Sequence, residues 1–407
     1  MPLFQYVARN VQGKTITGAS EAVSQTVAAR MLREQGLIPV SIELGAAAAA
    51  KGRRRRRGKG GRVRLDDLVV FSRMLAVMIR AGLPLIEVVN ILGEQADKRR
   101  LKDVLGQVER TVQEGSSFTE ALQKHPRVFN QFFVSMVKAG EASGMLDTIL
   151  DLVATYLEKM ASIQRKIRSA LTYPAVVGSF AMIITFVLVW KVVPQFESIF
   201  QDMGGQLPFM TRITVAISHF VQNHYLLMFL GIALIIVFLW QMKRTYAGKR
   251  LIDRIQLKLP VFGPLFLKVG VARFSRTLSV LIRAGVNILS ALEIVANTAG
   301  NSLIADAVMK TKTSIQSGET IAKPLVDSGV FPPMVTRMVD VGERTGALEN
   351  MLSKVADFYE DQVDATVGML MSLIEPLLIV FLGLVVGFIV ISMFLPLFKM
   401  IELVSAA

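Results

Sequence analysis

The chain has 407 residues, of which 52% are hydrophobic, and 46 Lys and Arg against 32 Asp and Glu give it a net charge of +14. A hydrophobic share this high beside 19% charged residues indicates a protein that lies partly in lipid and partly in water. The positive charge favours anionic partners. The absence of cysteine excludes disulfides, thiolate zinc sites and cysteine nucleophiles.

Residues 1–45 predict a small α+β segment. Leu3–Asn10 and Thr15–Ala22 flank a turn like a β-hairpin, Gln25–Gln35 is a short helix, and Ile38–Leu44 is a third strand. The stretch ARNVQGKT at the turn lacks the first glycine of a phosphate-binding loop, because Ala8 stands there. It is also followed by a strand and not by a helix, so we interpret it as a turn without a nucleotide.

Residues 46–64 form an Ala/Arg-rich linker. We expect its arginine run to contact anionic lipid at the membrane surface, at about 1 kcal/mol per basic residue. A plain solvated linker and a nucleic-acid-binding segment are the alternatives, and the second lacks the interleaved aromatic residues that would favour it. The residues of this predicted lipid contact are Arg53, Arg54, Arg55, Arg56 and Arg57.

Three apolar runs are long enough to cross a membrane. The predicted transmembrane helices are residues 171–193, 225–242 and 373–397, close to the length of about 20 residues that a bilayer requires. Basic residues crowd the segments before the first run and after the second. The positive-inside rule therefore places the N-terminus and residues 243–372 in the cytoplasm. Residues 194–224 become a periplasmic loop, and residues 398–407 a short periplasmic tail.

The chain contains an internal repeat. FSRMLAVMIRAG begins at Phe71 and FSRTLSVLIRAG at Phe274, and KAGEASGMLD at Lys138 corresponds to DVGERTGALE at Asp340. Helical periodicity in both copies predicts an all-α membrane protein with two repeated cytoplasmic helical bundles, at residues 65–170 and, after a linker, within 243–372. Each bundle precedes a span, and the second span has no counterpart in the repeat. We expect it to return the chain to the cytoplasm.

Paired residues at the ends of the predicted helices are the candidate functional positions. Arg80 and Arg283 suit a helix C-terminus, where a cation is favourable, or contact with a partner. Glu141 and Glu343 are expected to cap the following helix, with a docking contact or a divalent-cation site as the alternative. Glu375 lies at the membrane entry of the last span, and ionisable residues there indicate function. The predicted structural turns are Gly82, Gly140, Gly144, Gly285, Gly342, Gly346, Pro174, Pro194, Pro376 and Pro396.

No combination of residues indicates catalysis. His125, His219 and His224 form no metal-binding pair, and no nucleophile motif accompanies them. We therefore expect no catalytic residue, cofactor or metal, and no enzymatic activity.

The doubled FSRxLxVxIRAG and Gly-Glu-x-x-Gly motifs, the sequence VPQFE from Val193, and FQYVA from Phe4 resemble the inner-membrane platform proteins of type IV pilus and type II secretion systems, the PilC/GspF family. The resemblance implies two six-helix bundles, three spans, self-association, and a bacterial inner-membrane location. It also implies contact with a hexameric cytoplasmic assembly ATPase, with pilin or pseudopilin subunits and with other inner-membrane assembly proteins. We expect no nucleic-acid partner, because no reading motif accompanies the basic residues, and a basic membrane-anchored nucleic-acid protein is a third alternative. A small transporter is the less favoured alternative, because its spans would carry polar groups at the midplane.

Overall fold

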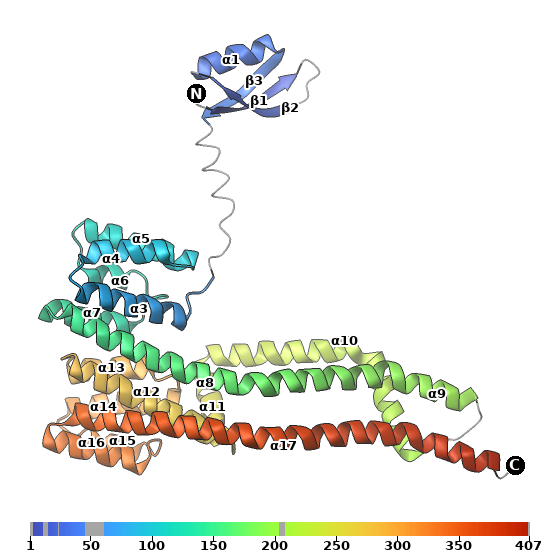
Figure 1. The fold of residues 1–407 in the computed structure, drawn as a ribbon. Helices are drawn as coiled ribbons and strands as arrows, with labels where there is room; N and C mark the ends of the chain where they lie inside the picture. Colours follow the sequence, from blue (N-terminus) through green and yellow to red (C-terminus); the bar gives the residue numbers. More distant parts are fainter. Residues whose placement is uncertain (1–2, 11–14, 23, 45–60, 203–207, 406–407) are drawn as a thin grey trace. The chain divides into compact units, whose positions relative to one another are not determined.

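The computed structural model describes residues 3–10, 15–22, 24–44, 61–202 and 208–405 (Figure 1). The predicted arginine contact at residues 53–57 and most of its linker lie outside the described residues. Contacts within the chain define two compact units. The first is Met1–Val63 with the short segment Ala96–Lys102, and the second is the rest of the chain.

The N-terminal unit is an α+β element, as predicted. Its strands β1 (Leu3–Asn10), β2 (Thr15–Glu21) and β3 (Leu37–Leu44) form an antiparallel sheet in the order β2-β1-β3, with helix α1 (Gln25–Glu34) between β2 and β3. Ala8 in β1 pairs with Ile16 in β2. The ARNVQGKT stretch thus lies between two antiparallel strands, and its first described residue after the turn, Thr15, begins a strand and not the helix that a phosphate-binding loop requires.

The first repeat folds as a bundle of six helices, as the resemblance implied. Rings of Phe71, Phe129 and Phe133 meet in its core, with centroids 5.1–6.4 Å apart. All three side chains are buried, and Phe71 faces this core because the apolar residues of α3 recur at helical spacing. The helices are α3 (Leu65–Arg80), α4 (Leu85–Gln95), α5 (Arg99–Gln113), α6 (Phe118–Gln123), α7 (Gln131–Ser143) and the first part of α8 (Leu146–Val187).

The second repeat forms a bundle of the same design. Phe274, the counterpart of Phe71, packs against Phe331 with ring centroids 4.7 Å apart. Helix α11 (Tyr246–Lys258) leads into it. The bundle itself consists of α12 (Gly263–Arg283), α13 (Ile288–Thr298), α14 (Ser302–Gln316), α15 (Ala322–Asp327), α16 (Pro333–Thr345) and the first part of α17 (Leu348–Ser405).

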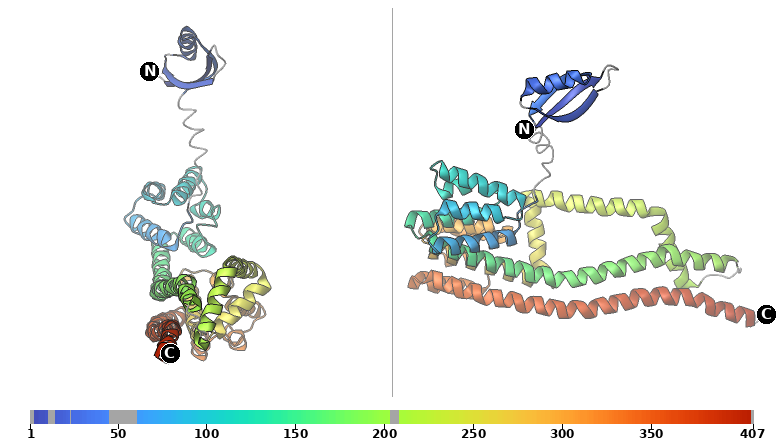
Figure 2. Two further views of the ribbon diagram at one scale, coloured as in Figure 1. Left: turned by 90° about the vertical axis from the view of Figure 1, so that its right-hand side faces the viewer. Right: turned by 45° about the horizontal axis from the view of Figure 1, so that its top comes forward.

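Among the described residues, three helices are long and apolar enough to cross a membrane, as predicted. They are α8 with its continuation through η1 (Leu188–Val192) into α9 (Val193–Asp202), then α10 (Phe209–Arg244), and α17. The pair α11–α12 would be a fourth only if counted as one span, and it is bent by 112°. α8 and α17 lie side by side (Figure 2), and each runs without a break from its bundle into its span.

The segment predicted as a periplasmic loop, residues 194–224, is mainly helical where it is described. It contains most of α9 and the first part of α10. α10 is kinked at His224, whose backbone angles are φ −124° and ψ 16°. The kink separates this first part from Tyr225, where the second span was predicted to begin. Trp190 and Tyr225 stack at this level, with ring centroids 6.2 Å apart.

The prediction that four prolines form turns is wrong, because all four lie in helices. Pro174 lies inside α8, Pro376 and Pro396 inside α17, and Pro194 at the second residue of α9. Lipid offers no hydrogen bonds to an open backbone, so a helix continues through a proline when its neighbours satisfy the freed carbonyl groups. The carbonyl of Ser392, four residues before Pro396, accepts a bond from Thr211 of α10.

Candidate functional site

Glu141 and Glu343 cap helices, but not the helices that we predicted. Glu141 accepts hydrogen bonds from the backbone N–H groups of Phe118, at 2.8 Å, and Thr119, at 2.9 Å, and also from the Thr119 hydroxyl. It therefore caps α6, which precedes it in the chain, and not the following helix α8. Glu343 likewise accepts from Ile321 at 2.9 Å, at the start of α15. A carboxylate on the exposed N–H groups of a short helix stabilises it directly.

Four of the six glycines predicted as turns form turns, whereas the prediction is wrong for Gly140 and Gly342, which lie inside α7 and α16. Gly82 and Gly285 have φ of +85° and +74°, and Gly144 and Gly346 both have φ of +70°, a conformation that favours glycine. Gly140 and Gly342 serve close packing instead. A Cβ atom on Gly342 would lie 2.9 Å from the Cα of Leu348, so only glycine lets α16 approach the start of α17 this closely.

Arg80 and Arg283 lie in the last turns of α3 and α12, as predicted, and both are exposed. Each forms an ion pair within the chain, Arg80 with Asp151 at 3.2 Å and Arg283 with Glu349 at 2.7 Å. These pairs give both arginines a structural role. Contact with a partner protein remains a prediction, since half of each side chain is still accessible.

A second pair of arginines, not singled out from the sequence, ties the long helices to the bundles. Arg73 donates to Glu158 at 2.6 Å and to Asp151 at 2.7 Å, and the bond between Arg73 and Glu158 lowers the pKa of the Glu158 carboxyl. Arg276 in the other repeat bonds Glu360 at 2.8 Å and also Asp357. Burial opposes the charge of Arg276, yet the two acidic partners outweigh it and raise its pKa. The signal was present, because both arginines belong to the repeated FSR motif.

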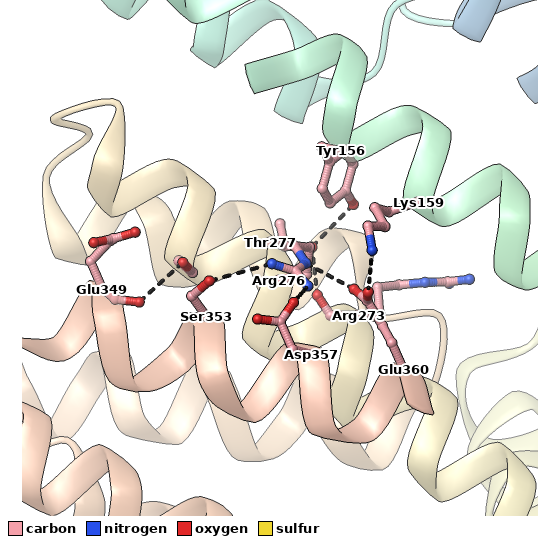
Figure 3. A network of polar contacts seen from close by, with 10 residues as sticks. Tyr156, Lys159, Arg273, Arg276, Thr277, Glu349, Ser353, Asp357 and Glu360 are labelled. Carbon is pink, nitrogen blue, oxygen red and sulfur yellow. Dashed lines mark hydrogen bonds and ion pairs between the residues drawn. The ribbon is translucent and has the colours of Figure 1, made fainter. Parts of the chain in front are cut away.

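The two bundles contact each other through a polar network that Figure 3 shows from close by. The Tyr156 hydroxyl of α8 lies 3.0 Å from the Thr277 hydroxyl of α12, and both side chains are buried. Lys159 of α8 forms an ion pair of 3.3 Å with Glu360 of α17, which Arg276 also holds. Burial raises the pKa of Tyr156, so the phenol stays protonated at physiological pH. Sequence reasoning missed this contact, because Tyr156 and Thr277 have no common motif.

Glu375 is exposed on α17, at the position that Tyr173 occupies in the first repeat. Within the described part of the chain, no group of three acidic or histidine side chains could hold a metal ion. A cation site at Glu141 or Glu343 therefore has no support from the arrangement of these residues. The arginine ion pairs and the polar network between the bundles have a mechanical role instead. They join the two bundles to each other and to the two membrane-spanning helices α8 and α17.

The two repeats also match a known protein family. The family model described as "Type II secretion system (T2SS), protein F" matches residues 71–194 and again 274–396, and its N-terminal domain matches residues 1–43. The chain belongs to this family. The matched segments contain both arginine networks, both glutamate caps and the first and last spans, so the features described above lie in the part that defines the family.

Relatives in the family align over all or nearly all of their length. A "Type IV pilus assembly protein PilC" of Thermus thermophilus is 46% identical over 100% of both chains. The protein of the same name from Myxococcus xanthus is 42% identical over 98% of this chain and 94% of its own. A "Type II secretion system protein F" of Vibrio cholerae is 31% identical over 100% of both chains. Membership and the three apolar helices make this chain a bacterial inner-membrane protein.

Proposed function

We propose that the chain is the inner-membrane platform of a type IV pilus machine, and that it couples a cytoplasmic hexameric assembly ATPase to the insertion or removal of pilin subunits. The alignment with two proteins named for type IV pilus assembly, which covers at least 98% of this chain, supports this function. The equivalent platform of a type II secretion system is the alternative, and the relative that favours it is less similar, at 31% identity.

The continuity of α8 and α17 carries the proposal. Each helix begins in a bundle and ends in a span, so a displacement of the bundle is transmitted to the bilayer along a rigid element without an intervening loop. Arg73 and Arg276 fix these helices to α3 and α12. An ATPase bound to the bundles would thereby move the spans that face the pilin subunits.

The buried polar groups of the membrane segments do not favour the alternative that the protein is a transporter. Thr214 bonds Ser392 at 2.9 Å, and Ser218 donates to the carbonyl of Val189. These contacts join the first part of α10 to the two proline-containing helices: the Ser218 bond satisfies a backbone carbonyl, and the Thr214 bond pairs two buried hydroxyl groups. A transported solute is not required to account for them.

Co-purification of the detergent-solubilised chain with the assembly ATPase and pilin of its own cell tests the proposal. We expect both to be retained, the purified chain alone to hydrolyse no ATP, and Lys14→Ala to leave pilus assembly intact. Turnover of ATP that Lys14→Ala abolishes would refute the platform function. Failure to retain either partner would leave only the fold in common with the family.

The Arg283–Glu349 pair offers a matched design that separates folding from docking. Arg283→Glu alone breaks the ion pair and reverses an exposed charge, whereas Arg283→Glu with Glu349→Arg restores the pair in the opposite order. If the double variant recovers the wild-type melting temperature but does not recover binding of the assembly ATPase, Arg283 is a docking residue. Recovery of both shows that it is structural only.

We further propose that Arg53–Arg57 hold anionic lipid. Replacing the five arginines with glutamine should weaken the binding of the full chain's cytoplasmic part to anionic vesicles, most clearly at low salt, because the attraction falls off over a Debye length. The measurement is the rate at which the reconstituted protein captures added anionic vesicles. Unchanged capture identifies the segment as a spacer.

A further inference from the structure

The contact between the two bundles joins unlike faces. The first repeat contributes one face of α8, with Tyr156 and Lys159, and the second contributes α12, with Thr277. Since the repeats share one fold, the first also has an α12-like face, on α3, and the second has an α8-like face, on α17. Two surfaces that could form the same contact are therefore present and are not joined to each other by any described contact within the chain.

Both of these surfaces are apolar and exposed. Met74, which corresponds to Thr277 in the repeat, is 45% exposed, whereas Thr277 is 0% exposed. Val70 and Val77 extend the exposed stripe on α3 at helical spacing. On α17, Phe358 corresponds to Tyr156 and is 42% exposed, against 6% for Tyr156.

The substitutions between the repeats are matched across the contact. The bonded hydroxyl pair of Tyr156 and Thr277 corresponds to Phe358 and Met74, two side chains that lack hydroxyl groups. A phenyl ring on a thioether is a favourable apolar contact. Further along α17, Met369 is exposed where its counterpart Ile167 packs near α17. We propose that the α3 face of one chain, defined by Val70, Met74 and Val77, binds the α17 face of a second copy, defined by Phe358 and Met369.

The membrane permits such an assembly. Lys159 pairs with Glu360 and Lys166 with Asp364, so α8 and α17 run in the same direction. The two repeats are therefore inserted with the same orientation, and repeating their contact between chains keeps every copy upright in one bilayer. A contact between unlike faces closes into a ring when its rotation permits. This interface does not depend on which ATPase or pilin the platform serves.

The ion pair of the internal contact is replaced by two like charges in the proposed interface. Lys159 corresponds to Asp361, and its partner Glu360 corresponds to Glu158, so the proposed interface brings two carboxylates together in place of an ion pair. Asp361→Lys would restore the opposite charges. We expect that variant to tighten self-association roughly two- to fivefold, the range for an exposed ion pair. Met74→Asp and Phe358→Asp should each weaken it by roughly tenfold or more, because a carboxylate is costly at an apolar contact.

Crosslinking tests the interface in the full chain, which has no native cysteine. Membranes that contain both Met74→Cys and Phe358→Cys chains, treated with a short bismaleimide, should yield a crosslink between two different chains. Neither variant alone should yield one, nor should Phe358→Cys with Met309→Cys, since Met309 is exposed on α14. A chain with both cysteines should give a covalent dimer for a ring of two, or a ladder for a larger ring.

Three outcomes would overturn the proposal. The first is no product from the mixed chains. The second is a product from Met74→Cys alone, which would mean that two α3 faces meet. The third is a crosslink within one chain between Met74→Cys and Val27→Cys, which would mean that the N-terminal unit covers α3. Because all of the substituted residues are exposed, an unchanged melting temperature confirms that a negative result does not come from unfolding.

Discussion

The side-chain amide of Gln222 in α10 donates a hydrogen bond of 2.8 Å to the backbone carbonyl of Trp190. Trp190 precedes Pro194 by four residues, so the proline, which has no N–H group, leaves this carbonyl without its helical partner. In the π-helical turn η1, where Val193 N–H bonds the carbonyl of Leu188, the carbonyl of Val189 would bond residue 194, and it accepts instead from the buried hydroxyl of Ser218. The first part of α10 thus supplies the bonds that the proline removes, and this explains why α8 can continue through η1 into α9.

Ser218→Ala should therefore destabilise the folded protein by about 1 kcal/mol, because it leaves a buried carbonyl without a donor. Ser179→Ala is the matched control, since Ser179 bonds only its own helix, at the carbonyl of Ala175. Unfolding of the detergent-solubilised protein measures both. In a double-mutant cycle, Pro194→Ala should reduce the cost of Ser218→Ala, and full additivity of the two would refute the explanation.

Removal of a glutamate cap should make the folded protein less stable. Glu141→Ala should lower the free energy of unfolding by about 1–2 kcal/mol, because it frees the N–H groups at the start of α6 and the hydroxyl of Thr119. Glu120→Ala at the same helix end is the control, because Glu120 is exposed. If the two variants have equal melting temperatures, the hydrogen bonds of Glu141 add no stability beyond that of any negative charge near the N-terminus of α6.

The sequence was sufficient to predict the elements that repeat or that recur at helical spacing. The paired FSR blocks specified two bundles, and the apolar runs specified three spans. The N-terminal unit followed from alternation of residues and one turn. These features depend on local pattern, and each is repeated or long enough for the pattern to be clear.

What the sequence did not predict depends on distant residues. Glu141 lies 22–23 residues from the N–H groups that it caps, so the nearer following helix was the natural but wrong assignment. Tyr156 and Thr277 are 121 residues apart. The prolines were assigned to turns by a rule for helices in water, and that rule does not hold where lipid makes the helix the most favourable state of the backbone.

Acidification should remove the contribution of Glu158. The hydrogen bond from Arg73 lowers the pKa of Glu158 below its ordinary value of 4.5. A carboxyl with a lowered pKa in the folded state stabilises the fold fully above its unfolded pKa, and this stabilisation is lost as the pH falls through the folded pKa. The melting temperature of wild type should thus exceed that of Glu158→Gln near neutral pH, and the difference should shrink below about pH 4.5.

Glu87→Gln is the control for this titration, because Glu87 is exposed in the first turn of α4. It should follow the wild-type profile. A constant difference between wild type and Glu158→Gln through the acid range would mean that the substitution acts by packing and not through the charge of the carboxylate.

The orientation of the chain gives the last prediction. Both bundles and their basic flanks should lie in the cytoplasm, with residues between α8 and the second part of α10 on the periplasmic side. The position of Arg244 over the Trp240 ring, at 3.5 Å from its centroid, suits the cytoplasmic end of α10, where an aromatic ring and a cation both favour the membrane surface.

Single cysteines at exposed Gln113 and Gln316 should resist an impermeant thiol reagent in intact cells, and a cysteine at Gln206 should react. After the cells are opened, Gln113→Cys and Gln316→Cys must become reactive, which shows that protection came from the membrane and not from folding. Labelling of only one bundle in intact cells would contradict the parallel insertion of the two repeats, and with it the task that we assign to α10.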